Sequence, residues 1–367
     1  MQDSIVKIFS TVSDPRVENR CLHKLTDILF IAFCTLLSNG EDFEDMVEFG
    51  KQRIDWLSEI LELPNGIPSH DTFNRVLQLI DPEDFSVCMI NDLPVLLDSV
   101  KDKLISLDGK KMKGVSPTSR GNKGLYILSA WVHENGICLG QQKVKDKSNE
   151  ITAIPELIDT LDVEGSTISI DAIGCQVSIA EKILEALADY LLSVKANQRN
   201  LYAEISDDYI WKSISCYDET WEYDHGRYEV RKCQIASAKE YLSPTLLSKW
   251  TGVKTVIKIE SQRTIKDVTT SQTRYYLSSE TKNAAYYNNA VRGHWSIENL
   301  LHWHLDVTFH EDANRSRSGY APQNLNILRK MALHRIGNMT DTLSLKKRRY
   351  RTSMNLEYLE KVLGLYF

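Results

Sequence analysis

The spacing of apolar residues changes once along the chain, close to residue 100. Before that point the spacing is helical, and Ser69 is placed to cap one of the helices. The expected helices are Leu22–Leu37, Phe43–Leu61, Asp71–Leu79 and a short one from Asp81-Pro82. We therefore expect residues 1–98 to form an all-α domain. Ser69–Arg75 could be a recognition helix, but the surrounding acidity suits a dimerisation or scaffold role equally well.

After residue 104 the pattern favours strands, with Asn135-Gly136 as a tight hairpin turn. The expected strands are Leu104–Asp108, Leu125–His133, Ile137–Val144, Ser166–Asp171 and Tyr190–Val194. Helices are expected at Glu150–Leu161 and Gln176–Leu187. The order β-β-β-α-β-α-β fits a mixed α/β sheet covered by helices on both faces, as in ribonuclease-H-like folds. In such folds the first and fourth strands lie side by side.

Residues 200–280 interrupt this alternation with segments rich in β-branched and aromatic residues. These segments are Thr220–Ala236, Val253–Ser261 and Thr273–Leu277, and they predict a small antiparallel insertion. A helical pattern over Ala284–Trp303 follows. The predicted organisation is thus an all-α domain, a mixed-sheet catalytic domain over residues 99–345 with the β-rich insertion, and a basic tail over 346–367.

Three carboxylates stand where such a fold would bring them together. Asp108 and Asp171 each end an expected strand, and Glu298 lies in the helical segment after the insertion. Three converging acids suit a pair of Mg²⁺ ions, or Mn²⁺ in their place, held against a phosphodiester. Each acid taken alone is more typical of a turn or a solvated helix face. A zinc site from His294, Glu298 and His302 is a weaker alternative, because the sequence lacks a His-Glu-x-x-His run.

Charge is distributed unevenly, and the cysteines give no framework. Residues 1–100 hold 18 acidic and 7 basic residues, whereas the rest of the chain is net positive. Ten of the 11 charged residues from Ala313 to Arg351 are basic, which suggests a phosphate-contacting stripe or a solvated helix face with a basic tail. Seven scattered cysteines without a CxxC pair argue against disulfides and thiolate zinc. No stretch reads as a membrane span or signal peptide, so we expect a cytoplasmic protein.

At several of these segments the chain resembles the H-repeat-associated group of DDE-type insertion-sequence transposases. The resemblance covers nearly the whole chain. It is carried by Phe9–Arg16, Ile67–Phe73, Asp108-Gly109-Lys110, Asp171-Ala172 with Gln176, Val194–Gln198, and Arg292–Asn299 continuing through Leu305–Asp312. It implies a helical transposase-associated domain, a ribonuclease-H-like catalytic domain, and catalytic metal ligands at Asp108, Asp171 and Glu298, with two Mg²⁺ ions per site.

The resemblance also implies the activity and the partners. The expected activity is cleavage at the 3′ ends of an element bounded by terminal inverted repeats, followed by strand transfer into target DNA by a homodimer. Related bacterial transposases carry Tyr, Arg and Lys at fixed spacing around the third acid, where this chain has Val291, His294 and Leu305. Arg292, Lys195 or Arg315 could substitute for them.

The residues expected to contact DNA are basic or lie beside the acids. They are Lys110, Lys195, Arg292, His294, His302, Arg315, Arg317, Lys346, Lys347, Arg348 and Arg349. Two other functions stay open: a ribonuclease-H-like nuclease without strand transfer, and a non-catalytic, domesticated DNA-binding protein.

Overall fold

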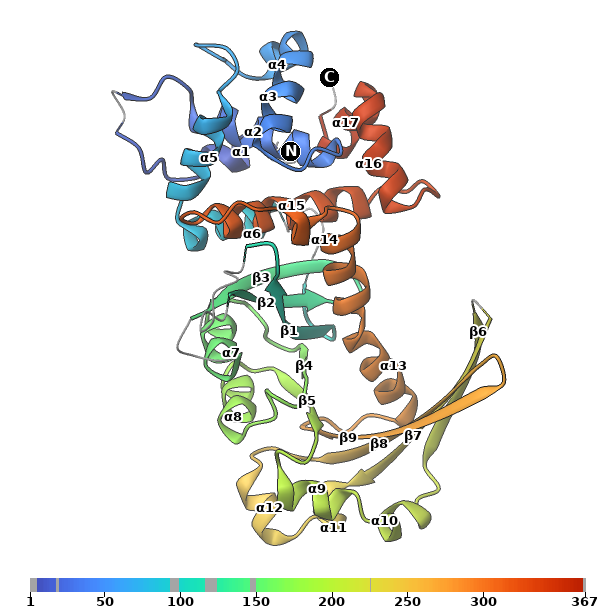
Figure 1. The fold of residues 1–367 in the computed structure, drawn as a ribbon. Coiled ribbons are helices and arrows are strands. Elements are labelled where there is room, and N and C mark those ends of the chain that lie inside the picture. The colour runs from blue at the N-terminus through green and yellow to red at the C-terminus, as the bar shows by residue number, and fades with distance from the viewer. Residues whose placement is uncertain are drawn as a thin grey trace.

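One long mixed sheet runs through the molecule, with a cap of helices at one end and projecting strands at the other (Figure 1). The computed structural model describes residues 5–17, 20–92, 99–115, 124–145, 150–224 and 226–365. The expected domain boundary at residue 98 lies outside these ranges. Within them, no helix has both the length and the apolar character needed to cross a membrane.

The first five strands have the order expected of a ribonuclease-H-like fold. They are β1 (Leu104–Met112), β2 (Leu125–Val132), β3 (Ile137–Val144), β4 (Thr167–Ile170) and β5 (Asp189–Val194), arranged in space as β3-β2-β1-β4-β5. β1 pairs antiparallel with β2 and parallel with β4, with Leu107 opposite Ile170. The predicted fold class and the adjacency of the first and fourth strands are confirmed.

The two faces of this sheet differ in chemistry because successive side chains alternate between them. One face is apolar: Leu107 and Ile170 are buried in a core with residues of α7 (Glu150–Asp159) and α8 (Val177–Glu185). The opposite face is polar along β1, where Ser106, Asp108 and Lys110 alternate with the apolar positions. This polar face carries the candidate site.

The β-rich insertion extends the same sheet. Its strands are β6 (Tyr217–Asp224), β7 (Arg227–Ser237), β8 (Thr255–Ile265) and β9 (Val268–Ser278). β9 pairs antiparallel with β5, so the sheet has nine strands among the described residues. The β-rich segment expected over Thr220–Ala236 forms most of an antiparallel hairpin, β6–β7. Four short helices accompany these strands: α9 (Arg199–Ile205), α10 (Asp208–Lys212), α11 (Ala238–Tyr241) and α12 (Pro244–Lys249).

The N-terminal helices are present as expected, apart from one break. They are α1 (Ile5–Ser10), α2 (Leu25–Leu37), α3 (Phe43–Gln52), α4 (Ile54–Ile60), α5 (His70–Leu79) and α6 (Pro82–Asp92). The segment expected as one helix over Phe43–Leu61 is divided at Arg53 into α3 and α4. Ser69 caps α5 by accepting a hydrogen bond from the amide of Thr72, as the sequence predicts.

The N-terminal helices share their hydrophobic core with helices from the other end of the chain. The segment expected as a basic tail is helical and is part of that core. α15 (Ala321–Gly337), α16 (Leu345–Met354) and α17 (Leu356–Leu363) share one hydrophobic core with α1–α6. In Figure 1 they lie beside the N-terminal helices, at the same end of the molecule. The helical cap is therefore built from both ends of the chain.

Arg349 of α16 joins three segments of this cap. Its guanidinium group is buried and donates hydrogen bonds to the carbonyl oxygens of Leu36 and Gly40, both at 2.9 Å, and of Thr308. The same group lies 4.4 Å from the ring centre of Phe309. A cation with three carbonyl acceptors is a structural anchor, so Arg349 is not available to DNA phosphates, which corrects its expected role.

We expect Arg349→Met to lower the free energy of unfolding by about 3 kcal/mol, because it leaves buried carbonyl groups without a donor. Lys346→Met is the matched control: it removes the same charge from an exposed position of the same helix and should change stability by no more than about 0.5 kcal/mol. Urea denaturation measures both variants. Equal effects would contradict the anchoring role.

Candidate active site

The pairing of β1 with β4 places two of the predicted acids side by side. Leu107 and Ile170 are opposite each other in the parallel strands β1 and β4. Asp108 directly follows Leu107, and Asp171 directly follows Ile170. Asp171 is held in a turn, because its Oδ1 accepts a hydrogen bond from the amide of Ile173 at 2.9 Å. Asp108 lies inside β1, which runs on to Met112 rather than ending at Asp108 as expected, whereas Asp171 directly follows the end of β4. The two acids thus stand at neighbouring positions of adjacent strand paths.

Glu298 reaches these acids from a distorted helix. The sequence predicts one continuous helix over Ala284–Trp303, but α13 (Ala284–His294) gives way to a π-helical turn at Ile297–His302, and α14 (Trp303–Val307) follows. Such turns are frequent at functional sites. Here the turn packs against β1. Its start is fixed by the buried Ser296, whose hydroxyl lies 3.1 Å from Nε1 of Trp131 and 2.9 Å from Nδ1 of His133.

A fourth carboxylate, Glu150, lies at the start of α7 and was missed by the sequence reasoning. A β-carbon added to Gly109 would stand 2.5 Å from its Oε1, so the glycine after Asp108 makes room for this side chain. Burial, followed by the charge of Asp171, raises the pKa of Glu150. The signal for Glu150 was weak, because an acid at a helix N-terminus is ordinary on dipole grounds alone.

The electrostatics show that the four acids share one environment. Burial raises the pKa of Asp108 to about 7, and Glu298, Glu150 and Asp171 add to the shift in that order. Burial, together with Asp171, also raises the pKa of Glu298. Close carboxylates with raised pKa values are typical of sites that receive a cation or a proton.

Arg274 of β9 opposes part of this negative charge, and sequence reasoning missed it too. Its positive charge acts to lower the pKa of Glu298. Its guanidinium lies 4.8 Å from the ring centre of Trp295, next to the π-helical turn. The extension of the sheet thus brings a cation to the third acid, where the helix itself carries His294. No local pattern marks Arg274, because its proximity depends on the β5–β9 pairing.

The two expected DNA-contacting histidines are held inside the site. His294 Nδ1 lies 3.0 Å from the hydroxyl of Ser169, which in turn donates a hydrogen bond to Ser106 at 3.1 Å. Burial lowers the pKa of His294 to about 4. His302 Nδ1 lies 3.4 Å from Oδ2 of Asp108, and burial with the nearby Lys330 and Lys110 lowers its pKa to about 3. Both rings are therefore neutral at pH 7.

This placement argues against the zinc alternative. The predicted zinc ligands were to share one helical face, but the π-helical turn breaks that face. His294 contacts β4 through Ser169, whereas His302 faces Asp108 on β1.

Two buried lysines, Lys110 and Lys330, lie near the acids. Lys110 Nζ is paired with Asp306 at 2.6 Å and with the buried Glu311 at 2.7 Å. Lys330 of α15 donates hydrogen bonds to Ser129 at 2.8 Å and Gln141 at 2.6 Å. Because its charge is already paired, Lys110 is a structural group in this arrangement, which corrects its expected contact with DNA.

The remaining basic residues divide into buried and exposed sets. Arg348 resembles Arg349: it bonds to Asp341 and to the carbonyl of Ile336, each at 2.8 Å. Arg329 and Lys330 are also buried, so the predicted basic stripe is not one continuous surface. Of the predicted DNA contacts, the exposed side chains are Lys195, Arg292, Arg315, Arg317, Lys346 and Lys347. Arg292 is paired with Glu222 of β6.

The sheet is ribonuclease-H-like, with acids at its first and fourth strands, and a third acid lies on a helix after an inserted β-region. Together these features define a DDE-type nucleic-acid-processing domain. Comparison with known proteins agrees. Residues 99–334 match the family model described as "Transposase DDE domain", and residues 6–91 match the one described as "DDE_Tnp_1-associated". The chain belongs to the DDE transposase family.

Full-length relatives support the same assignment. The chain is 35% identical to "Putative transposase YncI" of Escherichia coli O157:H7, over 98% of this chain and 94% of that protein. It is 34% identical to "H repeat-associated putative transposase YhhI" of Escherichia coli strain K12, over 98% of this chain and 97% of that protein. A protein of Xanthobacter autotrophicus, "Uncharacterized protein in dhlA 3'region", is 39% identical over 74% of this chain and 93% of its own length. The predicted resemblance to H-repeat-associated transposases is confirmed.

The raised pKa of Asp108 gives a pH dependence with a definite sign. Between pH 4 and pH 7 the folded protein binds a proton at Asp108 that the unfolded chain has released, so metal-free stability falls as pH rises through this window. We expect Asp108→Asn to be stabilising at pH 8 by on the order of 2 kcal/mol, and to have little effect near pH 4.

Denaturation in EDTA at the two pH values measures this difference. Asp267→Asn is the control, because Asp267 is an exposed acid in the β8–β9 turn, with a φ of 64° that asparagine also tolerates. A pH-independent effect of Asp108→Asn would contradict the clustered acids.

Proposed function

We propose that this protein is a DNA transposase that binds the terminal inverted repeats of its own element, frees the 3′ ends and joins them to target DNA. One observation carries the proposal: Asp108 in β1 and Asp171 just after β4 occupy neighbouring positions of adjacent strands, and the charge of Glu298 on the π-helical turn acts on Asp108. Neither step needs a covalent enzyme intermediate, so the site requires acids rather than a nucleophilic side chain.

The donor set suits divalent cations, and members of the DDE transposase family generally use them. Hard ions such as Mg²⁺ or Mn²⁺ prefer carboxylate oxygens, and this site offers several. Among the described residues, no three such side chains yet converge closely enough to hold one ion. We propose that Asp108, Asp171 and Glu298 hold two ions, with Glu298 moving most, because its side chain is exposed whereas Asp108 is largely buried. When bound, the ions would activate the attacking oxygen and stabilise the leaving one.

The surrounding residues orient the acids and limit their protonation. The neutral ring of His302 lies against Asp108 without competing as a cation. Lys110 and Lys330 place positive charge on the inner side of the site, and Arg274 places it beside Glu298. The open side is left for DNA phosphates.

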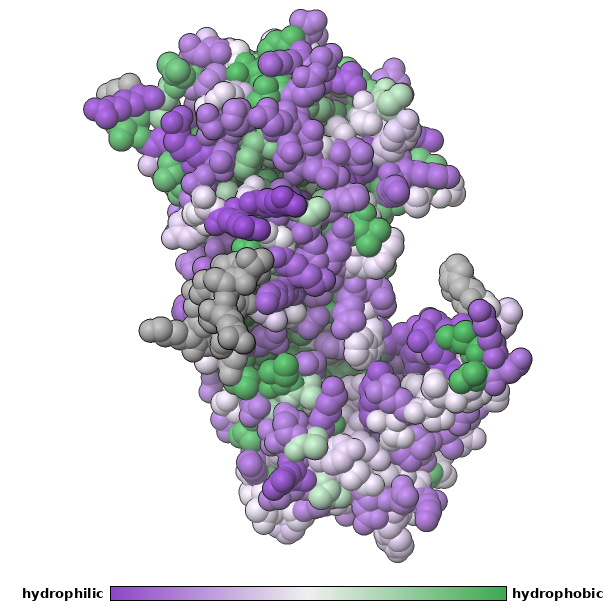
Figure 2. Space-filling view, in the orientation of Figure 1, coloured by the Kyte–Doolittle hydropathy of each residue, from purple (hydrophilic) through white to green (hydrophobic). Residues whose placement is uncertain are grey.

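A path for DNA lies in the notch between the projecting strands and the helical cap. Figure 2 shows this notch, with mostly hydrophilic side chains on the surfaces beside it. We propose that the exposed basic residues Lys195, Arg292, Arg315, Arg317, Lys346 and Lys347 contact the duplex, with binding that weakens as salt rises. Because two element ends must meet, the active assembly is at least a dimer, acting on DNA at the nucleoid.

The experiment is incubation of the full chain with Mg²⁺ or Mn²⁺, DNA carrying the element's ends, and a target plasmid. We expect cleavage at the 3′ ends and joining to the plasmid. Asp171→Asn should lower both rates by at least about 100-fold, because it removes a negatively charged metal ligand. Asp267→Asn, the exposed control, should retain both.

The other outcomes separate the alternatives. Cleavage without joining would favour a nuclease, and binding without cleavage would favour a non-catalytic DNA-binding protein. Full activity of Asp171→Asn would contradict the assignment of the acids.

A further inference from the structure

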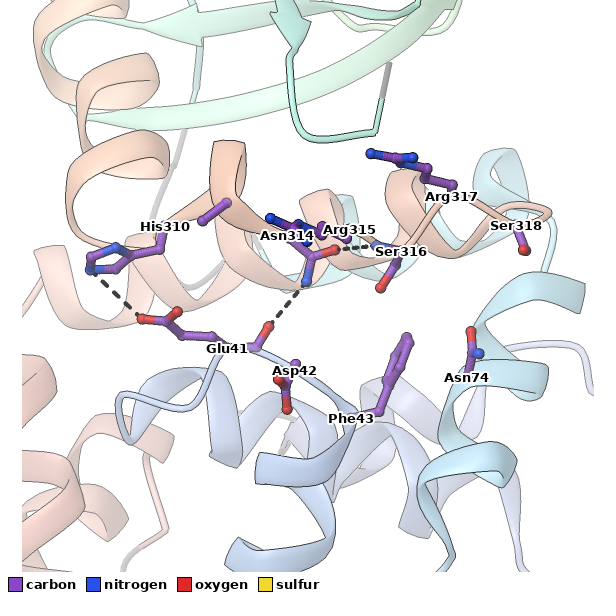
Figure 3. A pocket seen from close by; sticks show the side chains of 11 residues that line it. Glu41, Asp42, Phe43, Asn74, His310, Asn314, Arg315, Ser316, Arg317 and Ser318 are labelled. Atoms are coloured by element: carbon purple, nitrogen blue, oxygen red, sulfur yellow. Dashed lines mark hydrogen bonds and ion pairs between the residues drawn. The ribbon is translucent and has the colours of Figure 1, made fainter. Parts of the chain in front are cut away.

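A pocket of about 480 Å³ lies at the seam between the helical cap and the sheet, away from the four acids (Figure 3). One wall comes from the start of α3 and from α5, with Phe43 and Asn74. The other is the loop His310–Ser318 between α14 and α15. The lining residue Asn74 also falls within Ser69–Arg75, the segment that could be a recognition helix.

The loop side of the pocket offers positive charge that the described residues do not neutralise. Arg315 is exposed, with no hydrogen bond or ion pair to them. Arg317 donates through Nε to the carbonyl of Gly114 at 3.2 Å, which leaves its terminal nitrogens free of described partners. A β-carbon on Gly114 would lie 2.4 Å from the carbonyl oxygens of Asp312 and Asn314, so this glycine lets the loop pack closely on the end of β1. The two arginines are thus carried on a fixed support.

The opposite side offers an aromatic ring, an amide donor and carboxylate oxygens. The Asn74 amide oxygen accepts a hydrogen bond from Gln78 at 2.7 Å, which leaves its NH₂ group to donate elsewhere. Oδ1 of Asp42 caps α3, and its second oxygen has no hydrogen-bond partner among the described residues. Oε1 of Glu41 lies 3.7 Å from Nε2 of His310, which belongs to the loop on the other side of the pocket. In Figure 3 the ring of Phe43 points from α3 toward the loop.

The pocket has arginines on the loop side and carboxylates on the helix side. Together they match a ligand that is anionic at one end and a hydrogen-bond donor at the other. A simple anion would meet repulsion from Glu41 and Asp42. A nucleotide fits both sides: its phosphate suits Arg315 and Arg317, its base stacks on Phe43, and an exocyclic amino group donates to a carboxylate. The volume is in the range of small-molecule sites and far below that of a duplex.

We propose that this pocket binds one nucleotide whose base carries an amino group. The nucleotide could be free in solution or an unpaired residue of bound DNA. The second source lies within reach, because Gly114 follows Asp108 by six residues, at most about 20 Å along an extended chain. Only that second source rests on the proposed transposase function.

The test uses the full chain and saturation-transfer NMR with dAMP, dCMP, dTMP and inorganic phosphate as probes. We expect dAMP or dCMP to bind at least about 10-fold tighter than dTMP or phosphate. Arg315→Ala with Arg317→Ala should weaken that binding at least about 10-fold. Phe43→Leu, which keeps the packing but removes the stacking ring, should weaken it as well. Lys239→Ala with Lys249→Ala is the control, because it removes equal charge from exposed positions of α11 and α12 that have no proposed contact with nucleic acid.

A second arm separates the two sources and the two proposals. A duplex that carries an unpaired 2-aminopurine should bind tighter than the fully paired duplex if the nucleotide comes from DNA, and no tighter than the paired duplex if the nucleotide comes from solution. Equal binding of phosphate and all nucleotides, or pocket variants that bind as the control does, would overturn the site even if the parent cleaves DNA. Nucleotide binding by a parent that does not cleave DNA would support the site and count against the transposase function.

Discussion

Repulsion among four carboxylates is the constraint on which the rest of the site depends. Parallel pairing of β1 and β4 brings Asp108 and Asp171 together, and burial then raises the pKa of Asp108 to about 7. Such an arrangement costs free energy in the folded protein unless a cation or a proton joins it. A site kept at this cost is expected to be functional rather than structural.

One cation from the extended sheet, Arg274, opposes part of this repulsion at Glu298. Lys110 and Lys330 are held by other partners: Lys110 pairs with Asp306 and Glu311, and Lys330 donates to Ser129 and Gln141. The helical cap contacts the segment that follows the site, because Arg349 of α16 donates a hydrogen bond to the carbonyl oxygen of Thr308, directly after α14.

Alternation of apolar residues and order along the chain were enough to predict the first five strands and the adjacency of β1 and β4. The catalytic and metal-binding roles of the acids stay predictions. β3 and its hairpin turn at Gly136 match the expected segments, because local turn chemistry and period-two patterning act over short distances. What failed depended on distant contacts. The burial of Arg349 requires three segments to meet, and the π-helical turn at Glu298 reflects packing on β1 rather than helix propensity. A basic pattern alone cannot distinguish a phosphate contact from a buried anchor.

The central claim is that Asp108 shares a buried cluster of acids that a divalent cation can complete. Its most direct test is a carbon-13 NMR titration of the aspartate carboxylates in the full chain, with Asp108→Asn identifying the resonance. We expect a midpoint near pH 7 in EDTA, and a shift to much lower pH when Mg²⁺ is added. A midpoint near the ordinary value of 3.8, unchanged by Mg²⁺, would contradict it.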